Sequence, residues 1–427
     1  MISRDAFSLF ALAILSAGLS AASPAAGLLL LAAGSGLLML TLRAWAYPGF
    51  LFALVFSLDL LLGGLNLSRY RGEIEPDYFR FLAFSLASLS GGYALGSLGA
   101  KRVTGTGITD LLPQNWIILA AVIPGLFGIA LMISETHSLP LFQPSTRYAA
   151  SAQSIVLSET LIVPFILSAL TLHRNSSPFH KVLVALLLLL LCLPGYRGWP
   201  ICALGVTVCV ALAQGVTRRT LSLAALAGSA SAALLALGST FRRLENTALL
   251  SPADSMRIYD AEYLPQWFAQ LHFTLRESIA VGQRLFFLRQ DGQAGDPLLF
   301  ADLATLLPGQ QLAAGDMMGE AFGQLQAGGL TALLPAILFH DYGYLALVIL
   351  GVTALLMGVW WQRISLAPTL IRLALYFLCC FYFIHAFNRG ALKPAYFLVP
   401  AVMLGADWLA RQMPQPRSVP SLLAQEG

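Results

Sequence analysis

The chain has 427 residues, of which 57% are hydrophobic and only 11% are charged. A soluble domain carries about 25% charged residues, so this composition excludes an ordinary soluble protein and predicts an integral membrane protein. The formal net charge of +4 is too small to indicate a nucleic-acid partner.

Apolar stretches predict an all-α polytopic membrane protein with about twelve transmembrane helices, because about 20 apolar residues are needed to cross the hydrocarbon core. The first stretch follows Arg4 and has no convincing cleavage site, so it is interpreted as a span and not as a signal peptide. The predicted spans lie at 6–22, 25–42, 47–66, 79–98, 116–133, 152–172, 181–195, 199–217, 220–240, 341–361, 365–386 and 394–411.

Lysine and arginine in the short loops indicate the orientation, since such residues are enriched on the cytoplasmic side. With the N-terminus inside, the inner loops hold eleven of these residues and the outer loops hold seven. Both termini are therefore predicted to be cytoplasmic, and the long polar segment after the ninth span is predicted to be periplasmic.

This long polar segment, residues 241–329, holds ten acidic residues, six arginines and no lysine. Arginine offers a planar fork that matches phosphate and carboxylate, so the bias is a first indication of anion recognition. The whole chain has only three lysines, so codon preference is an alternative explanation. Helical periodicity predicts helices at 260–288 and 316–325. The predicted organisation is 1–240 (nine spans), 241–340 (periplasmic loop domain), 341–411 (three spans) and 412–427 (disordered cytoplasmic tail).

Four arginines at the outer ends of spans are candidate ligands for an anion. Arg197 stands between two glycines in the short turn 194–200 (PGYRGWP), where backbone can approach a ligand closely. Arg147, Arg243 and Arg389 follow or precede other spans on the same predicted face. The alternative for each is an anchoring role at the lipid headgroups.

The predicted helix at 260–288 carries Arg276, Glu277 and Arg284 within about two turns of one another. A carboxylate among arginines suits a general base beside a bound anion, and Glu277 is the candidate base. The alternative is that Glu277 forms salt bridges with these arginines. Glu159 lies in the outer half of its span, where ionisable groups are costly and usually functional or paired.

No metal or nucleotide motif is present in the sequence. The five cysteines all fall in apolar stretches, and the six histidines show no HExxH or comparable spacing. A GxxxxGK[ST] phosphate loop is also missing from the sequence. We therefore expect neither a metal nor a cofactor.

The order of several short motifs resembles the Wzy-type oligosaccharide repeat-unit polymerases, the family of O-antigen and enterobacterial common antigen polymerases. Many spans surround one large, late outer loop, and an arginine–glycine turn, 195–198 (GYRG), comes two spans before it. The segments 306–309 (LLPG), 328–335 (GGLTALLP) and 340–345 (HDYGYL) then follow. The resemblance covers roughly residues 142–410.

This resemblance implies a metal-independent glycosyltransferase of the bacterial inner membrane. Such an enzyme moves a glycan from undecaprenyl pyrophosphate to a lipid-linked repeat unit on the periplasmic face. Its partners would be undecaprenyl-pyrophosphate-linked oligosaccharides, membrane lipids and a polysaccharide chain-length regulator, with no nucleic acid. Arg197, Arg147, Arg243 and Arg389 would bind the pyrophosphate, while Arg276, Arg284 and Glu277 would be catalytic.

Three alternatives remain open at this stage. An O-antigen ligase shares the topology but transfers polymer to lipid A-core. A lipid-linked oligosaccharide flippase or transporter would show charges deep in several spans and an internal repeat. A sensor or scaffold would have no need of Arg197 in a span turn.

Overall fold

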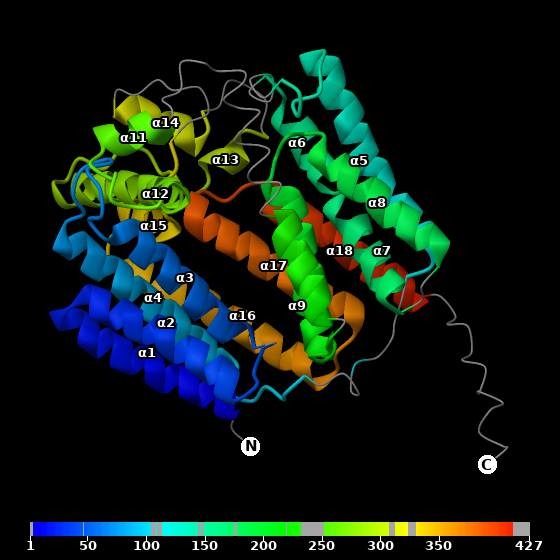
Figure 1. The fold of residues 1–427 in the computed structure, drawn as a ribbon, viewed down its shortest axis with the longest axis horizontal. Helices are drawn as coiled ribbons and strands as arrows, with labels where there is room; N and C mark the ends of the chain where they lie inside the picture. Colours follow the sequence, from blue (N-terminus) through cyan, green and yellow to red (C-terminus); the bar gives the residue numbers. More distant parts are fainter. Residues whose placement is uncertain are drawn as a thin grey trace.

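The computed structural model describes residues 3–45, 47–103, 108, 113–143, 146, 149–174, 177–218, 220–231, 252–306, 312–322 and 330–412. The elements it describes are α-helices (Figure 1). The helices before the long polar segment are α1 (Arg4–Ala22), α2 (Pro24–Thr41), α3 (Pro48–Gly64), α4 (Pro76–Gly96), α5 (Asn115–Thr136), α6 (Ala152–Glu159), α7 (Ile162–Arg174), α8 (Pro178–Cys192) and α9 (Gly198–Gln214). Those that follow are α11 (Pro252–Ile258), α12 (Gln266–Gln290), α13 (Ala301–Ala304), α14 (Ala314–Ala321), α15 (Leu334–Tyr342), α16 (Leu345–Leu366), α17 (Leu370–Arg389) and α18 (Ala395–Gln412).

Six of the described helices are long and apolar enough to cross a membrane: α1, α2, α5, the continuous segment Ala152–Leu172, α16 and α17. The protein is therefore a helical membrane protein. Of the span predicted at 220–240, the structure describes only the helix Thr220–Ser231, and the rest lies outside the described residues. The remaining predicted spans coincide with helices that are shorter or more polar, so the total of twelve spans stays a prediction. The tenth predicted span, 341–361, corresponds to α16, which begins four residues later, at Leu345, because Gly343 (φ +62°) ends α15.

Helices α4 and α16 form the closest helix pair, and glycines allow it. A Cβ atom on Gly92 would lie 2.1 Å from the Gly351 carbonyl oxygen, and one on Gly96 would lie 2.1 Å from the Leu355 carbonyl oxygen. Small residues four apart let two helix backbones approach closely. The van der Waals packing that results stabilises helix association in a lipid environment. Helices α1, α2 and α3 complete this first group.

The second group contains α5–α9 and α18, and α17 connects it to the first. Helix α17 packs on α9 and α18, and it reaches the first group through Phe387, whose ring stacks on Phe56 at 4.0 Å. A Cβ atom on Gly205 of α9 would lie 2.3 Å from the Phe381 ring. This glycine lets the Phe381 ring lie directly against the α9 backbone.

Helices α11–α14 gather at one end of the bundle (Figure 1). The predicted helices at 260–288 and 316–325 correspond to α12 and α14. Helix α12 packs against α3 and α15. Helix α15 is buried from Leu334 to His340, so this segment is a packed helix at the base of the loop region.

Candidate functional site

One face of α17 carries three polar side chains, Tyr382, His385 and Arg389. Their spacings of three and four residues place them one above another along the helix. Arg389 is the last residue of α17 and is exposed, whereas Tyr382 is buried. The face therefore leads from the end of the helix into the bundle.

Glu159 is the buried carboxylate at the inner end of this face. It ends α6, next to the start of α7, and its exposed fraction is 8%. The Tyr382 hydroxyl donates a hydrogen bond to Glu159 Oε1 at 3.0 Å, and the Trp199 side chain bonds the same carboxyl group. The Lys393 ammonium group is close enough to act on Glu159 electrostatically. A buried carboxylate with these neighbours is placed to accept a proton.

A buried polar atom close to Glu159, the Tyr396 hydroxyl oxygen, lacks a partner among the described residues. The side-chain oxygen of Asn388, the residue before Arg389, also lacks one. The Tyr396 ring lies 5.2 Å from the Tyr382 ring and 5.9 Å from the His385 ring. An unsatisfied buried polar group costs about 1–3 kcal/mol, so these atoms mark a place where a ligand can supply hydrogen bonds.

Arg197 reaches the same place from α9. It precedes Gly198, the first residue of α9, and a Cβ atom on Gly198 would lie 3.5 Å from His385 Cε1. Gly195 has a φ of +72°, which glycine adopts without strain and which allows the tight turn before Arg197. Lys393 and Arg389 both act electrostatically on His385. The structure therefore places Arg389 and Lys393 close to His385, and it brings the turn that carries Arg197 next to the same imidazole.

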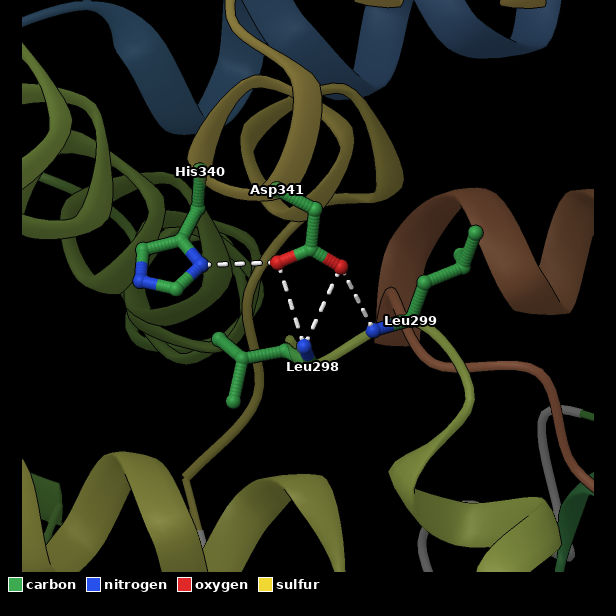
Figure 2. Close-up of polar contacts among 4 residues, drawn as sticks. All are labelled: Leu298, Leu299, His340 and Asp341. Carbon is green, nitrogen blue, oxygen red and sulfur yellow. Dashed lines mark hydrogen bonds and ion pairs between the residues drawn. The ribbon is translucent and has the colours of Figure 1, made fainter. Parts of the chain in front are cut away.

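A buried acid, Asp341, fixes the backbone at Leu298 and Leu299 (Figure 2). Its carboxylate accepts hydrogen bonds from the backbone N–H of Leu298 at 3.1 Å and of Leu299 at 2.9 Å. His340 Nδ1 lies 2.8 Å from Asp341 Oδ1, and both side chains are less than 5% exposed. We call this arrangement of Asp341, His340, Leu298 and Leu299 the Asp341 clamp.

The Asp341 clamp is connected to the cationic residues through a backbone hydrogen bond. The Leu299 carbonyl oxygen accepts from the Leu392 N–H at 3.0 Å, and Lys393 is the next residue. Ala391 packs against Ala301 of α13 and Ala314 of α14. The clamp thus holds α13 and α14 against the short connection between α17 and α18.

Arg276 has a different environment from the other candidate arginines. It is fully buried, and all five of its N–H groups meet acceptors, so no N–H group remains for a bound anion. Burial also lowers the pKa of Arg276 below its usual value. The acceptors are the carbonyl oxygens of Tyr70 (2.8 Å), Leu65 (2.9 Å), Gly63 (3.3 Å) and Gly72, and Asn66 Oδ1 (2.7 Å).

Glu277 and Arg284 stand apart from Arg197. Glu277 forms an ion pair at 3.2 Å with Arg71, outside the arginines considered from the sequence. Arg284 is exposed, with its guanidinium 5.5 Å from the centre of the Phe322 ring. Helix α12 packs on α3 and α15, whereas α9 packs on α17, α7 and α8, so the α12 cluster and Arg197 have different neighbours. Arg147 and Arg243 lie outside the described residues.

Sequence reasoning found Arg197, Arg389 and Glu159 but gave no role to Tyr382, Tyr396 and Lys393. The 382–385–389 spacing on one predicted helix is a signal that could have found Tyr382. Lys393 and Tyr396 follow a turn, and their meeting with Glu159 depends on how α6 and α18 pack. Among the described residues, no group of three or more His, Cys, Asp or Glu side chains could hold a metal ion.

Chemically, this end of the bundle can hold a polyanion with its three cations and can take a proton at Glu159. We call the set Glu159, Arg197, Tyr382, His385, Arg389, Lys393 and Tyr396 the α17 site. No protein-family model, curated protein or solved structure matches the chain.

Proposed function

We propose that the protein is a membrane glycosyltransferase that polymerises lipid-linked repeat units. In this reaction, a glycan leaves undecaprenyl pyrophosphate and joins a hydroxyl group of a second lipid-linked unit. The observation that carries the proposal is the position of Lys393, which acts on both the buried Glu159 and His385, with Arg389 and the turn that carries Arg197 next to the same His385.

The three cations support the choice of a pyrophosphate leaving group. The glycosyl C1–O bond to the pyrophosphate breaks, and the departing oxygen takes up negative charge. Fixed cations near the membrane surface stabilise that charge more effectively than water, because the surrounding protein has a low dielectric constant. The activated donor supplies the free energy, so the reaction needs no nucleotide.

Glu159 is the base in this proposal, in place of Glu277. The acceptor hydroxyl forms the new O–C1 bond and loses its proton, which Glu159 takes. Glu159 belongs to the α17 site and accepts a hydrogen bond from Tyr382, whereas Glu277 is paired with Arg71, outside that site. The partnerless Tyr396 hydroxyl is available to orient the acceptor sugar.

The test compares Arg197→Ala, Arg389→Ala and Glu159→Gln in a strain that lacks the native copy. Each variant should be expressed at the normal level but give single-repeat glycans, with a loss of polymer of at least about 100-fold for a lost transition-state contact. Arg363→Ala is the matched control, since Arg363 is an exposed arginine in the last turn of α16, outside the α17 site. Gel separation of the polysaccharide by chain length is the readout.

Long-chain polysaccharide at the normal level in Arg197→Ala and Arg389→Ala would contradict the proposal. The same strains also separate the alternatives. A ligase would leave full-length polymer on the carrier lipid when inactivated, and a flippase would leave repeat units on the cytoplasmic side. Purified protein given two lipid-linked repeat units should form the dimeric product without any added protein.

A further inference from the structure

A charged cavity lies at the end of α9 that is remote from the α17 site. Its volume is about 300 Å³, and its walls come from the start of α1, the turn between α2 and α3, the segment after α4, the end of α9 and the end of α16. Residues 212–216 line it, while Gly198 at the opposite end of the helix adjoins the α17 site. The 17 residues of α9 separate the two places by about 25 Å.

The walls of this cavity are cationic. Arg43, Lys101 and Arg102 face one carboxylate, Asp5, so these side chains give a net charge of +2 (three positive, one negative). Arg102 is held in place by a hydrogen bond to the Leu42 carbonyl oxygen, and the Lys101 N–H bonds Ser365 Oγ at 2.9 Å. The cations therefore lie on the segments that follow α2 and α4, which hydrogen bonds connect to each other and to the end of α16.

Arg43 occupies a backbone position that favours glycine. It follows the end of α2 with a φ of +51°, and the Ala44 N–H closes back to the Met39 carbonyl oxygen at 3.0 Å. Such a left-handed residue after a helix is usually glycine or asparagine. An arginine here places its charge at the cavity despite the unfavourable backbone conformation, which points to a use for that charge.

Two tryptophans show that the cavity is also suited to lipid. Trp45 and Trp361 both line it, the first 38% exposed and the second 2% exposed. The ends of the membrane-crossing helices α1, α2 and α16 meet here, so the cavity lies at the level of one membrane surface. Tryptophan favours that level, and basic pockets between helices there bind anionic headgroups.

We propose that this cavity binds the phosphate headgroup of an anionic phospholipid. The headgroup would lie between Arg43, Lys101 and Arg102, with its glycerol part against the tryptophans. A lipid held in this way joins the first helix group to the end of α9, and so to the helix that begins at the α17 site. The ligand chemistry is a phosphate ester, which inorganic phosphate shares only in part.

The experiment uses the full-length protein, purified in a neutral detergent and stripped of lipid. Native mass spectrometry measures binding of phosphatidylglycerol, of phosphatidylcholine and of inorganic phosphate. We expect phosphatidylglycerol to bind at least ten-fold more tightly than phosphatidylcholine. The triple variant Arg43→Ala, Lys101→Ala, Arg102→Ala should lose at least ten-fold of that affinity, and Arg363→Ala, from the same end of α16, should lose less than two-fold.

Each outcome decides the proposal. Equal binding of the two phospholipids, or unchanged phosphatidylglycerol binding in the triple variant, would overturn it. Competition by inorganic phosphate at the same concentration as the lipid would show a free-anion site and overturn the lipid assignment. Should the triple variant not fold, Arg43→Ala and Lys101→Ala must each weaken phosphatidylglycerol binding about five-fold, the contribution of one basic residue at a membrane surface.

Discussion

Arg276, one of the candidate arginines, holds two parts of the fold together through its guanidinium group. Arg276 directs all five N–H groups at the end of α3 and the segment that follows it. His272 contacts the same part of the chain. Its Nδ1 lies 2.6 Å from the Leu62 carbonyl oxygen, and its Nε2 lies 3.0 Å from Ser68 Oγ. Arg276 is therefore a residue that holds α12 to the membrane bundle.

We predict that Arg276→Ala lowers the free energy of unfolding by about 3 kcal/mol or more, because five buried acceptors lose a charged donor. Arg276→Lys should recover only part of this loss, since an ammonium group has three N–H donors in place of five. Thermal unfolding in detergent is the measurement. Arg289→Ala, an exposed arginine on the same helix, should change stability by less than about 0.5 kcal/mol.

The residue scale also shows the reach of sequence reasoning. Arg197 could be selected because glycines flank it in a short turn, and this local pattern survives in the structure. The sequence could not show that Arg276 is buried while Arg284 is exposed, because the helical pattern does not say which face of the helix meets residues 63–72. Its acceptors are about 200 residues earlier in the chain. Contacts of this range depend on packing and leave no local pattern.

At the scale of single elements, the α4–α16 pair depends on the missing side chains of its glycines. Gly92→Ala would place a methyl group 2.1 Å from the Gly351 carbonyl oxygen, so the helices must separate along their length. We predict a loss of about 2 kcal/mol or more in stability, the usual range for overpacking a close contact. The neighbouring Gly91→Ala is the control, because its Cβ would meet only Ala13, at 3.9 Å.

Thermal unfolding of the two glycine variants in the same detergent gives the comparison. Gly91→Ala should be neutral or slightly stabilising, since alanine is the better helix former. Equal melting temperatures for the two variants would contradict the close approach of α4 and α16. Apolar periodicity predicted both helices, but only the structure shows that Gly92 and Gly351 face each other.

At the scale of the whole molecule, the Asp341 clamp couples three regions that are distant in sequence. Asp341 at the end of α15 holds Leu298 and Leu299, and Leu299 in turn bonds Leu392. The segment at Leu298 and Leu299, the end of α15 and the α17–α18 connection are therefore joined by consecutive hydrogen bonds. No pattern in the sequence predicts these partners of Asp341, because Leu298 and Leu299 contribute only backbone N–H groups.

We predict that Asp341→Ala raises hydrogen exchange at Leu298, Leu299 and Leu392 by at least ten-fold, since two backbone N–H groups lose a charged acceptor worth about 1.5–3 kcal/mol each. Asp341→Asn should raise it less, because one side-chain oxygen remains. Asp296→Ala, an exposed acid nearby, is the control. Faster exchange at Leu298 and Leu299 without any change at Leu392 would show that the three regions are not coupled.

The contact between Gly205 and Phe381 has a consequence for the rotation of α17 about its own axis. The Phe381 ring packs directly on the α9 backbone at Gly205, and this contact favours one rotation of α17 about its axis. Tyr382, His385 and Arg389 share a helical phase, so any turn of the helix displaces all three in the same sense. Successive residues are about 100° apart around a helix. A side chain at position 205 would displace the Phe381 ring, and the resulting rotation of α17 would move all three polar side chains together.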